Sequence, residues 1–238
     1  MYKHSDFILT PIYTILSEVS AANAAVGDGI ETYPLSEYIF QSVFLKMTGF
    51  QEQKMKCIVW ELATNDYVYR YKRFSQDQLG ECSKYDEKKK VYLDLIQAIK
   101  VFDRTFVVSN QLDRRAIRRE TIDEMKYVFL TSNLSGWNES LAGEFFAKHG
   151  DIIKDTYFAL PDNLLENVLQ ERYELLYRHR NRCAHNTLSY QENVPTLLEI
   201  LDKSYQHDHY IMRFILLSLI DKVSIELYKI YRRLVESN

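Results

Sequence analysis

Apolar residues recur every three or four positions along most of the chain, which is the spacing of an α-helix rather than of a strand. The last segment, 210–235, is the clearest case and the most hydrophobic part of the sequence. Its apolar positions are Ile211, Phe214, Ile215, Leu219, Val223, Leu227, Ile230, Tyr231 and Leu234. A helix that is apolar around most of its circumference is buried by its neighbours. We therefore expect 210–235 to be the central helix of a bundle.

Similar spacing near the N-terminus predicts further helices. Residues 5–26 repeat apolar positions at helical steps, and Ser5 at their start is a candidate N-cap. Residues 36–73 continue the pattern, with Ser36 as a candidate N-cap and Gly49 as an interruption. This stretch predicts either two helices or one helix that bends.

The middle of the chain alternates helical periodicity with polar segments. Further helices are expected over 91–102, 114–130, 137–149 and about 162–186. Residues 75–90 are the most polar of the chain and predict a loop or an exposed helix start that offers almost nothing to a core. The lysines at its end, Lys88, Lys89 and Lys90, are expected to form a solvated turn. The stretch 105–110 could form a short strand, and strand content should otherwise be near zero.

The composition favours a helical protein. The chain has 238 residues, of which 46% are hydrophobic and 26% are charged, which is ordinary for a globular domain. It contains 7 Gly and 4 Pro, against about 16 and about 12 at average usage, so turns are few and regular elements are long. No internal repeat is evident, which argues against a solenoid. We expect one all-α domain over 1–238, an antiparallel helical bundle in which 1–160 completes or decorates the core.

Charge and cysteine content narrow the setting of the protein. The net charge is −3, so attraction to RNA or DNA must come from local basic patches. Three cysteines, none of them in a CxxC pair, suggest neither a zinc site nor a redox dithiol and fit a reducing compartment. The N-terminal segment lacks the features of a signal peptide, and the apolar run 214–220 is too short to span a membrane. We expect a cytoplasmic protein that uses no metal or cofactor and does not bind a membrane.

The most unusual local pattern is YRHRNRCAHN at 177–186, near the end of the expected long helix. The apolar stripe of that helix runs through Leu165, Leu169, Tyr173, Leu176, Arg180 and Cys183. Arg180 thus occupies a position where a leucine would be expected, and Cys183 is expected to be a small buried residue on the same stripe. His185 lies roughly 140° away from Arg180 around a regular helix, so the two side chains point in different directions.

Three arrangements would bring Arg180 and His185 to one phosphate group. The helix could end or kink between them, the long arginine side chain could reach round, or a second copy of the chain could supply the missing residue across a twofold axis. A histidine with a pKa of about 6.5 can give or take a proton near neutral pH. Arginine donates a planar fork of hydrogen bonds to a phosphate whose charge grows in the transition state. Such a cleft could cleave RNA by attack of its own 2′-hydroxyl without a metal ion.

Arg180, Asn181 and His185 match the R-N-x-x-x-H form of the R-x(4–6)-H signature, and in this motif the chain resembles the HEPN domains. The resemblance implies a helical homodimer that cleaves RNA without a metal, in a toxin–antitoxin, anti-phage or CRISPR-associated system, with an antitoxin or sensor protein as a further partner. It implies that Arg180 and His185 are catalytic and that Asn181 assists them. Arg178 also fits the wider spacing to His185, and Thr187 stands where HEPN toxins often carry Tyr.

The neighbouring cations suggest a binding role, and a function without catalysis is the alternative. Arg178, His179 and Arg182 are expected either to hold the phosphate backbone of the substrate or to be solvated charges at a helix end. HEPN-like domains can also lose catalysis and persist as interaction modules. The same stripe would then be a protein interface in a defence or regulatory complex.

Two further patterns have a simple structural interpretation. Four arginines within 114–119 alternate with acidic residues and favour a solvated, salt-bridged helix face over a contact with RNA backbone. They are Arg114, Arg115, Arg118 and Arg119. The HD dipeptide at 207–208, taken with His185 and Asp221, resembles part of the metal site of HD phosphohydrolases, but the intervals are short and a polar helix start is favoured. His149 is expected to end a helix and is given no catalytic role.

Overall fold

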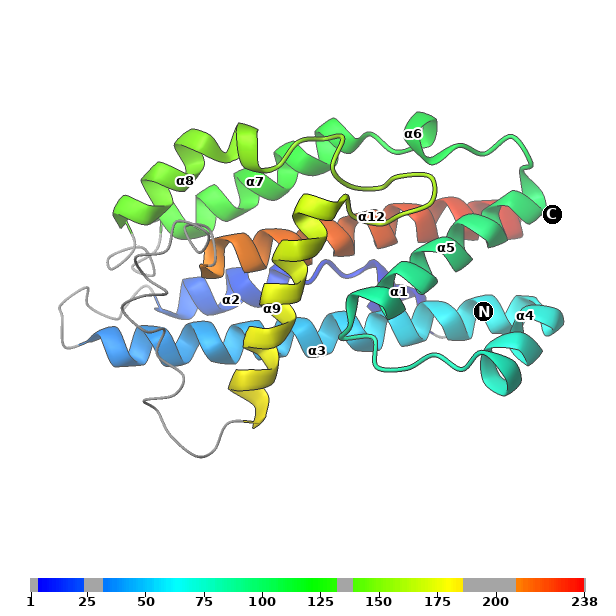
Figure 1. The fold of residues 1–238 in the computed structure, drawn as a ribbon, viewed down its shortest axis with the longest axis horizontal. Helices are drawn as coiled ribbons and strands as arrows, with labels where there is room; N and C mark the ends of the chain where they lie inside the picture. The colour runs from blue at the N-terminus through cyan, green and yellow to red at the C-terminus, as the bar shows by residue number, and fades with distance from the viewer. Residues whose placement is uncertain (1–3, 24–31, 132–138, 186–208, 238) are drawn as a thin grey trace.

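The computed structural model describes four parts of the chain, 4–23, 32–131, 139–185 and 209–237. Its helices are α1 (Ser5–Leu9), α2 (Tyr13–Asn23), α3 (Tyr33–Asn65), α4 (Tyr67–Tyr71), the π-helical turn η2 (Lys72–Gln76), α5 (Tyr85–Phe102), α6 (Val108–Gln111), α7 (Arg114–Thr131), α8 (Glu139–Ile152), α9 (Asn167–His185) and α12 (Tyr210–Glu236) (Figure 1). In these parts, strand-like pairing is limited to one isolated bridge between Phe158 and Leu165. The expected all-α class is confirmed there. None of the helices in the described ranges is long and apolar enough to cross a membrane.

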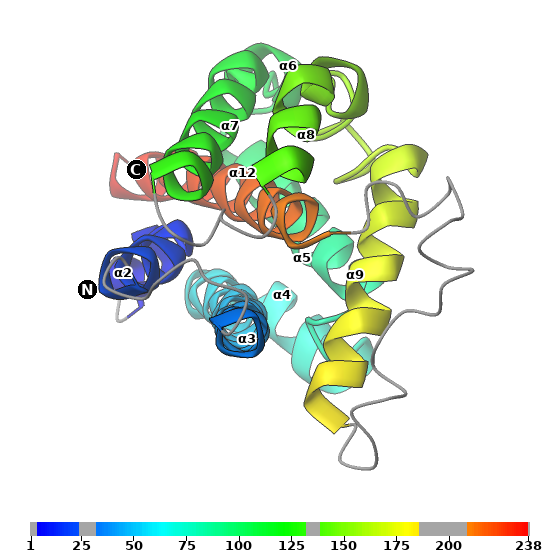
Figure 2. The same cartoon turned by 90° about the vertical axis from the view of Figure 1, so that its left-hand side faces the viewer.

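Helix α12 lies at the centre of the bundle, as its sequence predicts. Figures 1 and 2 show it with α7 on one side and α3 on the other, and α5 also packs against it. Every side chain from 210 to 221 is buried. Because α3, α5 and α7 all come from 1–160 and share one hydrophobic core with α12, this front part of the chain completes the core.

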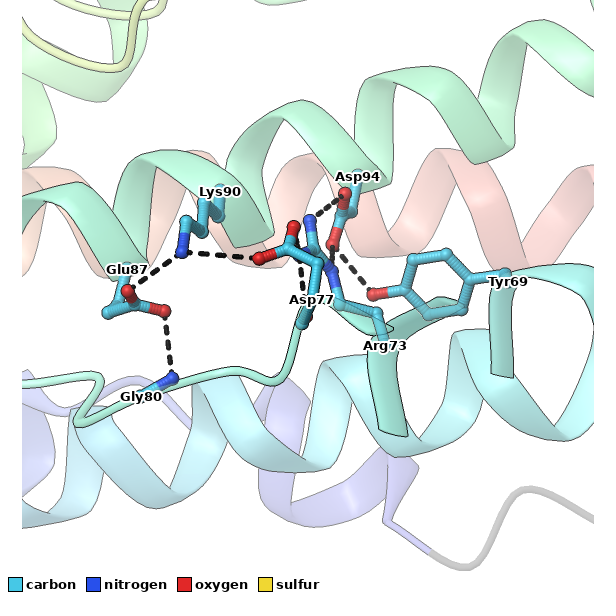
Figure 3. Close-up of polar contacts among 7 residues, drawn as sticks. All are labelled: Tyr69, Arg73, Asp77, Gly80, Glu87, Lys90 and Asp94. Atoms are coloured by element: carbon cyan, nitrogen blue, oxygen red, sulfur yellow. Dashed lines mark hydrogen bonds and ion pairs between the residues drawn. The ribbon is translucent and has the colours of Figure 1, made fainter. Parts of the chain in front are cut away.

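The helices around α12 do not simply alternate in direction. In Figure 1, α3, α5 and α12 run the same way along the bundle, from left to right, whereas α2 and α7 run the opposite way. The expected antiparallel arrangement is therefore wrong for α3, α5 and α12. The reason lies in the connection before α5. After η2, residues 77–84 return along α3, so that α5 begins near the middle of α3 and runs in the same direction (Figures 1 and 3).

The first expected helix is broken into α1 and α2. Pro11 has no backbone N–H to donate and restricts the residue before it. Thr10 accordingly adopts an extended backbone, with φ −72° and ψ 116°. His4 takes the N-cap position of α1 in place of Ser5, whose hydroxyl lies 2.8 Å from the hydroxyl of Tyr228 in the core. Helical periodicity alone did not reveal this break.

The next stretch forms one long helix, α3, which passes Gly49 without interruption. Of the two alternatives for this stretch, a separation near Gly49 is wrong. Ser36 lies inside α3 rather than at its N-cap, because the helix starts with Pro34 in its first turn, where a missing N–H costs nothing. The chain leaves α3 at Asp66, whose carboxylate accepts from the Tyr69 N–H at 2.9 Å and caps α4.

Ion pairs hold the segment between α4 and α5 (Figure 3). The residues involved are Tyr69, Arg73, Asp77, Gly80, Glu87, Lys90 and Asp94. Arg73, only 5% exposed, donates to both carboxylate oxygens of Asp94 at 2.7 Å and to Asp77 at 2.5 Å. The Tyr69 hydroxyl donates to Asp94 at 2.7 Å, and Glu87 accepts from the Gly80 N–H at 3.0 Å. Charge-assisted bonds of this kind fix a polar segment without much apolar burial.

The polar segment 75–90 nevertheless contributes to the core, contrary to the expectation from its composition. Cys82, Tyr85 and Lys88 are buried, and α5 begins at Tyr85, earlier than predicted. The Tyr85 hydroxyl donates to Asn163 Oδ1 at 2.7 Å and so ties α5 to the loop before α9. Lys88 follows Tyr85 by three residues and shares its inward face, so the solvated turn expected for Lys88 is wrong.

The remaining elements differ from the predictions mainly at their ends. The short strand that 105–110 could have formed is not observed, because the chain forms the short helix α6 there and the N–H groups of Asn110 and Gln111 donate to the Val107 carbonyl. Helix α8 is described from Glu139, and the expected start at 137 lies outside the described residues. Helix α9 begins at Asn167, after a loop, rather than near 162.

Candidate functional site

Helix α9 carries the motif and lies across the bundle. Figures 1 and 2 show it crossing α3, with its C-terminal end extending beyond α3. Leu169, Tyr173 and Leu176 are buried, and the Tyr173 hydroxyl donates to the Ser83 carbonyl at 2.7 Å. These residues form the stripe that the spacing predicts, and Arg180 takes its next position. The packing of α9 thus holds Arg180 at the edge of the core.

Arg180 is half-buried, with 22% of its side chain exposed, and has two acceptors nearby. Its Nη1 donates to Oδ1 of Asn181 at 3.1 Å. Its Nη2 lies 4.0 Å from Oε2 of Glu52 on α3, and Glu52 also accepts from Lys56 at 2.8 Å. A guanidinium with a loose ion pair and a local hydrogen bond keeps donors available for a ligand.

His185 is exposed in the last turn of α9. The helix continues without a break from Asn167 to His185, so a kink or helix end between Arg180 and His185 is not what the structure shows. In a continuous helix the two residues remain roughly 140° apart. Residues 186–208, which include the polar residues expected to end the helix, lie outside the described residues. Two of the three arrangements remain for bringing Arg180 and His185 to one phosphate: the Arg180 side chain extends around the helix, or a second copy of the chain supplies one of the two residues.

His179 of the motif is half-buried and packs against two aromatic rings of the core. Its ring contacts Phe44 of α3 and Tyr210 of α12, with 5.4 Å between ring centroids in each case. Nε2 lies 3.1 Å from the Tyr210 hydroxyl, which donates to Glu37 at 3.2 Å. Burial, and secondarily two nearby arginine charges, lower the pKa of His179 to about 3, so the ring is neutral at pH 7. No sequence signal pointed to Glu37, Phe44 or Tyr210 as neighbours of the motif.

The other side chains of the motif differ in exposure. Arg178 and Arg182 are exposed and can meet an anion in solvent. Cys183 is half-buried rather than buried, and its Sγ lies 3.4 Å from His179 Nε2. Burial raises the pKa of the Cys183 thiol, so it is protonated at neutral pH and is a poor nucleophile. The motif therefore presents arginine and histidine, but not thiolate, chemistry.

A buried cation lies behind the stripe. Lys88 of α5 is 1% exposed, and its Nζ is 5.9 Å from the ring centroid of Tyr173. Burial lowers the pKa of Lys88 to about 8, while the negative charge of Glu52 acts in the opposite direction. Glu52 thus interacts with three cations, Lys88 from within, Arg180 from the edge and Lys56 on its own helix. This arrangement could not be predicted from the sequence, because Lys88 lies in the most polar stretch of the chain.

The HD interpretation finds no support in the described residues. The dipeptide at 207–208 lies outside them, and His209 caps α12 by accepting from the Met212 N–H at 3.3 Å. Asp221, 1% exposed, accepts from Lys54 Nζ at 2.5 Å and from the Ile12 N–H at 3.0 Å. Asp221 is thus occupied in the core. Among the described residues, no group of three His, Cys, Asp or Glu side chains could hold a metal ion.

The structure brings together only part of the residue set that the sequence singled out. Arg180 and Asn181 are in contact, with the exposed Arg178 and Arg182 on the same helix. His185 lies on another face of that helix. Comparison with protein-family models, with curated proteins and with solved structures gave no match for this chain. The interpretation of the site therefore rests on its own geometry and on the motif.

Proposed function

We propose that this protein is a metal-independent endoribonuclease of the HEPN type. The position of Arg180 carries the proposal, because α9 holds its guanidinium at the edge of the core, bonded to Asn181, shortly before an exposed histidine. An arginine held in this way is suited to bidentate contact with a phosphate. The exposed imidazole of His185 can exchange protons with a substrate or with water.

The proposed reaction transfers an RNA phosphate to the neighbouring ribose oxygen. His185 takes the proton of the 2′-hydroxyl, O2′ forms a bond to phosphorus, and the bond from phosphorus to O5′ breaks. The leaving O5′ takes up a proton, which gives a 2′,3′-cyclic phosphate and a 5′-hydroxyl. Arg180 stabilises the charge of the pentacoordinate phosphorus, and Asn181 orients its guanidinium through the 3.1 Å hydrogen bond.

The cations around this pair divide into two roles. Arg178 and Arg182 are exposed and would bind flanking phosphates of the RNA. His179, which the sequence suggested for the same purpose, is neutral and packed against Tyr210, so the proposal gives it a packing role.

A twofold dimer completes the proposed site. Because Arg180 and His185 face different directions on one continuous helix, one phosphate is best reached by Arg180 of one protomer and His185 of its partner. Two such pairs would form one cleft. A cellular role as a toxin or anti-phage effector, restrained by an antitoxin or sensor protein, belongs to the same proposal.

The direct test is incubation of the purified protein with total RNA in EDTA. Wild type should release fragments with a 2′,3′-cyclic phosphate, and His185→Ala should lower the rate by a factor of about 100 or more. Arg104→Ala, which removes an exposed arginine elsewhere, is the control and should cleave normally. Cleavage by His185→Ala at the wild-type rate, or loss of wild-type cleavage in EDTA, would reject the mechanism.

Mixing variants tests the shared cleft. Arg180→Ala and His185→Ala protomers, each inactive alone, should regain part of the activity when they are mixed, because half of the mixed sites keep both residues. Proteins that stay monomeric at the working concentration, and still cleave, would contradict the dimeric site.

The contact between Arg180 and Glu52 favours a second candidate function, a non-catalytic helical module of a defence or regulatory complex. In that case the guanidinium mainly fastens α9 to α3 and shapes a protein interface. Arg180→Ala would then weaken assembly in sedimentation experiments, with no RNA cleavage to lose. Growth arrest on expression that His185→Ala relieves would favour the ribonuclease instead.

A further inference from the structure

A groove between α7 and α8 gathers basic side chains far from the motif. Its volume is about 390 Å³, which falls in the size range of small-ligand sites. Its basic lining residues are Arg115, Arg118, Arg119, Lys126 and His149. Figures 1 and 2 show α7 and α8 on the opposite side of α12 from α3, whereas the C-terminal end of α9 extends beyond α3. This α7–α8 groove is therefore separate from the proposed ribonuclease site.

The acidic residues near the groove neutralise it only in part. Glu120 and Glu124, two of the acidic residues close to the arginines in the sequence, accept from Lys222 of α12 at 3.3 and 2.8 Å. The groove itself contains two carboxylates, Asp123 and Asp155. Asp155 pairs with Arg115 at 3.1 Å, but the Arg115 side chain is 90% exposed, so water and salt screen this pair. Four cationic side chains thus face two carboxylates.

One polar group of the groove has the character of a ligand donor. The Nε atom of Arg118 is buried and has no hydrogen-bond partner among the described residues. A buried donor without an acceptor is uncommon in proteins and is normally satisfied by a ligand or water. His149 Nδ1 lies 2.7 Å from the Phe146 carbonyl, which can only accept, so Nδ1 carries the hydrogen. In the neutral ring, Nε2 is then an acceptor, so the ring offers no donor to an anion. Gly150 lies beside the Arg118 guanidinium, and a Cβ added there would lie 3.7 Å from Nη2.

We propose that the α7–α8 groove binds phosphate groups, with Arg115, Arg118 and Arg119 as the main ligands. Guanidinium groups match the geometry of phosphate oxygens, and an excess of cations in a partly enclosed groove strengthens the attraction. The phosphates can belong to a free pyrophosphate-bearing nucleotide or to the backbone of RNA. The inference uses no residue of the proposed ribonuclease site, so either can fail without the other.

The test compares two probes on the full chain at low salt in EDTA. Inorganic pyrophosphate is titrated by calorimetry, and a fluorescent 2′-O-methyl oligonucleotide, which cannot be cleaved by 2′-hydroxyl attack, is followed by anisotropy. The double variant R115A/R119A removes two exposed groove cations, and K100A/R104A removes two exposed cations of another surface as the matched control. We expect the groove variant to bind pyrophosphate at least about 10-fold more weakly and the control to bind like wild type.

The oligonucleotide identifies the source of the phosphate. If RNA backbone is the ligand, the oligonucleotide displaces pyrophosphate, and the groove variant lowers the slope of log K against log salt by about 1 to 1.5. If a free nucleotide is the ligand, pyrophosphate binds without competition from the oligonucleotide. The proposal is overturned if wild type binds neither probe, if R115A/R119A binds both like wild type, or if both double variants lose affinity equally.

Discussion

Replacement of the buried Lys88 by methionine should make the protein more stable at neutral pH. The ammonium of Lys88 is 1% exposed, and burial lowers its pKa to about 8. The unfolded chain keeps the ordinary pKa of about 10.4, so the folded protein loses about 3 kcal/mol at pH 7 by holding this cation in the core. The cation–π contact of Nζ with the Tyr173 ring, at 5.9 Å, stabilises the folded protein by about 1 to 2 kcal/mol at most. Methionine has a similar length and fills the site without a charge, so K88M should gain about 1 to 2 kcal/mol.

The pH dependence of this gain has a defined sign. Because the pKa of Lys88 is lower in the folded protein, the unfolded chain binds more protons between pH 8 and about pH 10.4. The stability of wild type therefore rises with pH in this window relative to a variant that lacks the amine. Between pH 7 and pH 9 the advantage of K88M should shrink by about 1 kcal/mol.

Urea unfolding followed by circular dichroism, at pH 7 and at pH 9, measures both effects. K100M, an exposed substitution on the same helix, is the control and should show neither. The difference between wild type and K88M removes the contributions of cysteines and tyrosines, which both proteins share. The reasoning is wrong if wild type is more stable than K88M at pH 7 by an amount that does not change with pH. In that case the charges of Glu52 and Asp221 fully offset the desolvation cost of the Lys88 ammonium.

Three further predictions concern other buried polar groups. K54M should destabilise the protein by about 3 kcal/mol in urea unfolding, because it leaves the Asp221 carboxylate buried with only one donor. The double variant K54M/D221L should recover much of this loss, and additive losses from the two substitutions would contradict the prediction. D94N should cost about 2 kcal/mol, since the buried guanidinium loses two charged acceptor oxygens, and D77N, at an exposed partner, should cost less. Lowering the pH from 7 to 5 should destabilise wild type by about 2 kcal/mol more than His179→Phe, because a pKa of about 3 in the folded state means that only the unfolded chain takes up the proton. Equal acid sensitivity of the two proteins would show that His179 is not held neutral.

The helical class and the central helix could be predicted because both follow from local spacing. In α12 the apolar residues surround the helix, so burial on all sides is the only stable arrangement. The stripe of α9 was found in the same way, and it correctly placed Arg180 next to buried leucines and Tyr173. Pro11 is a local signal for a helix break. The apolar spacing continues across it, however, and spacing alone predicted one helix. The parallel direction of α3 and α5 could not be predicted, because a connecting segment can run back along a helix without any periodic pattern in its sequence.

Local spacing was enough to predict most of the helices, their inward faces and the motif that suggests a ribonuclease. The packing of the helices, by contrast, sets the surroundings of each charge. It placed Lys88 in the core, made His179 neutral beside Tyr210, and paired Glu120 and Glu124 with Lys222. Three arginines of α7, Arg115, Arg118 and Arg119, instead line the groove toward α8. A hydrophobic pattern has the period of the helix and is local, whereas the free energy of a charge depends on its solvation and on partners far away in the sequence.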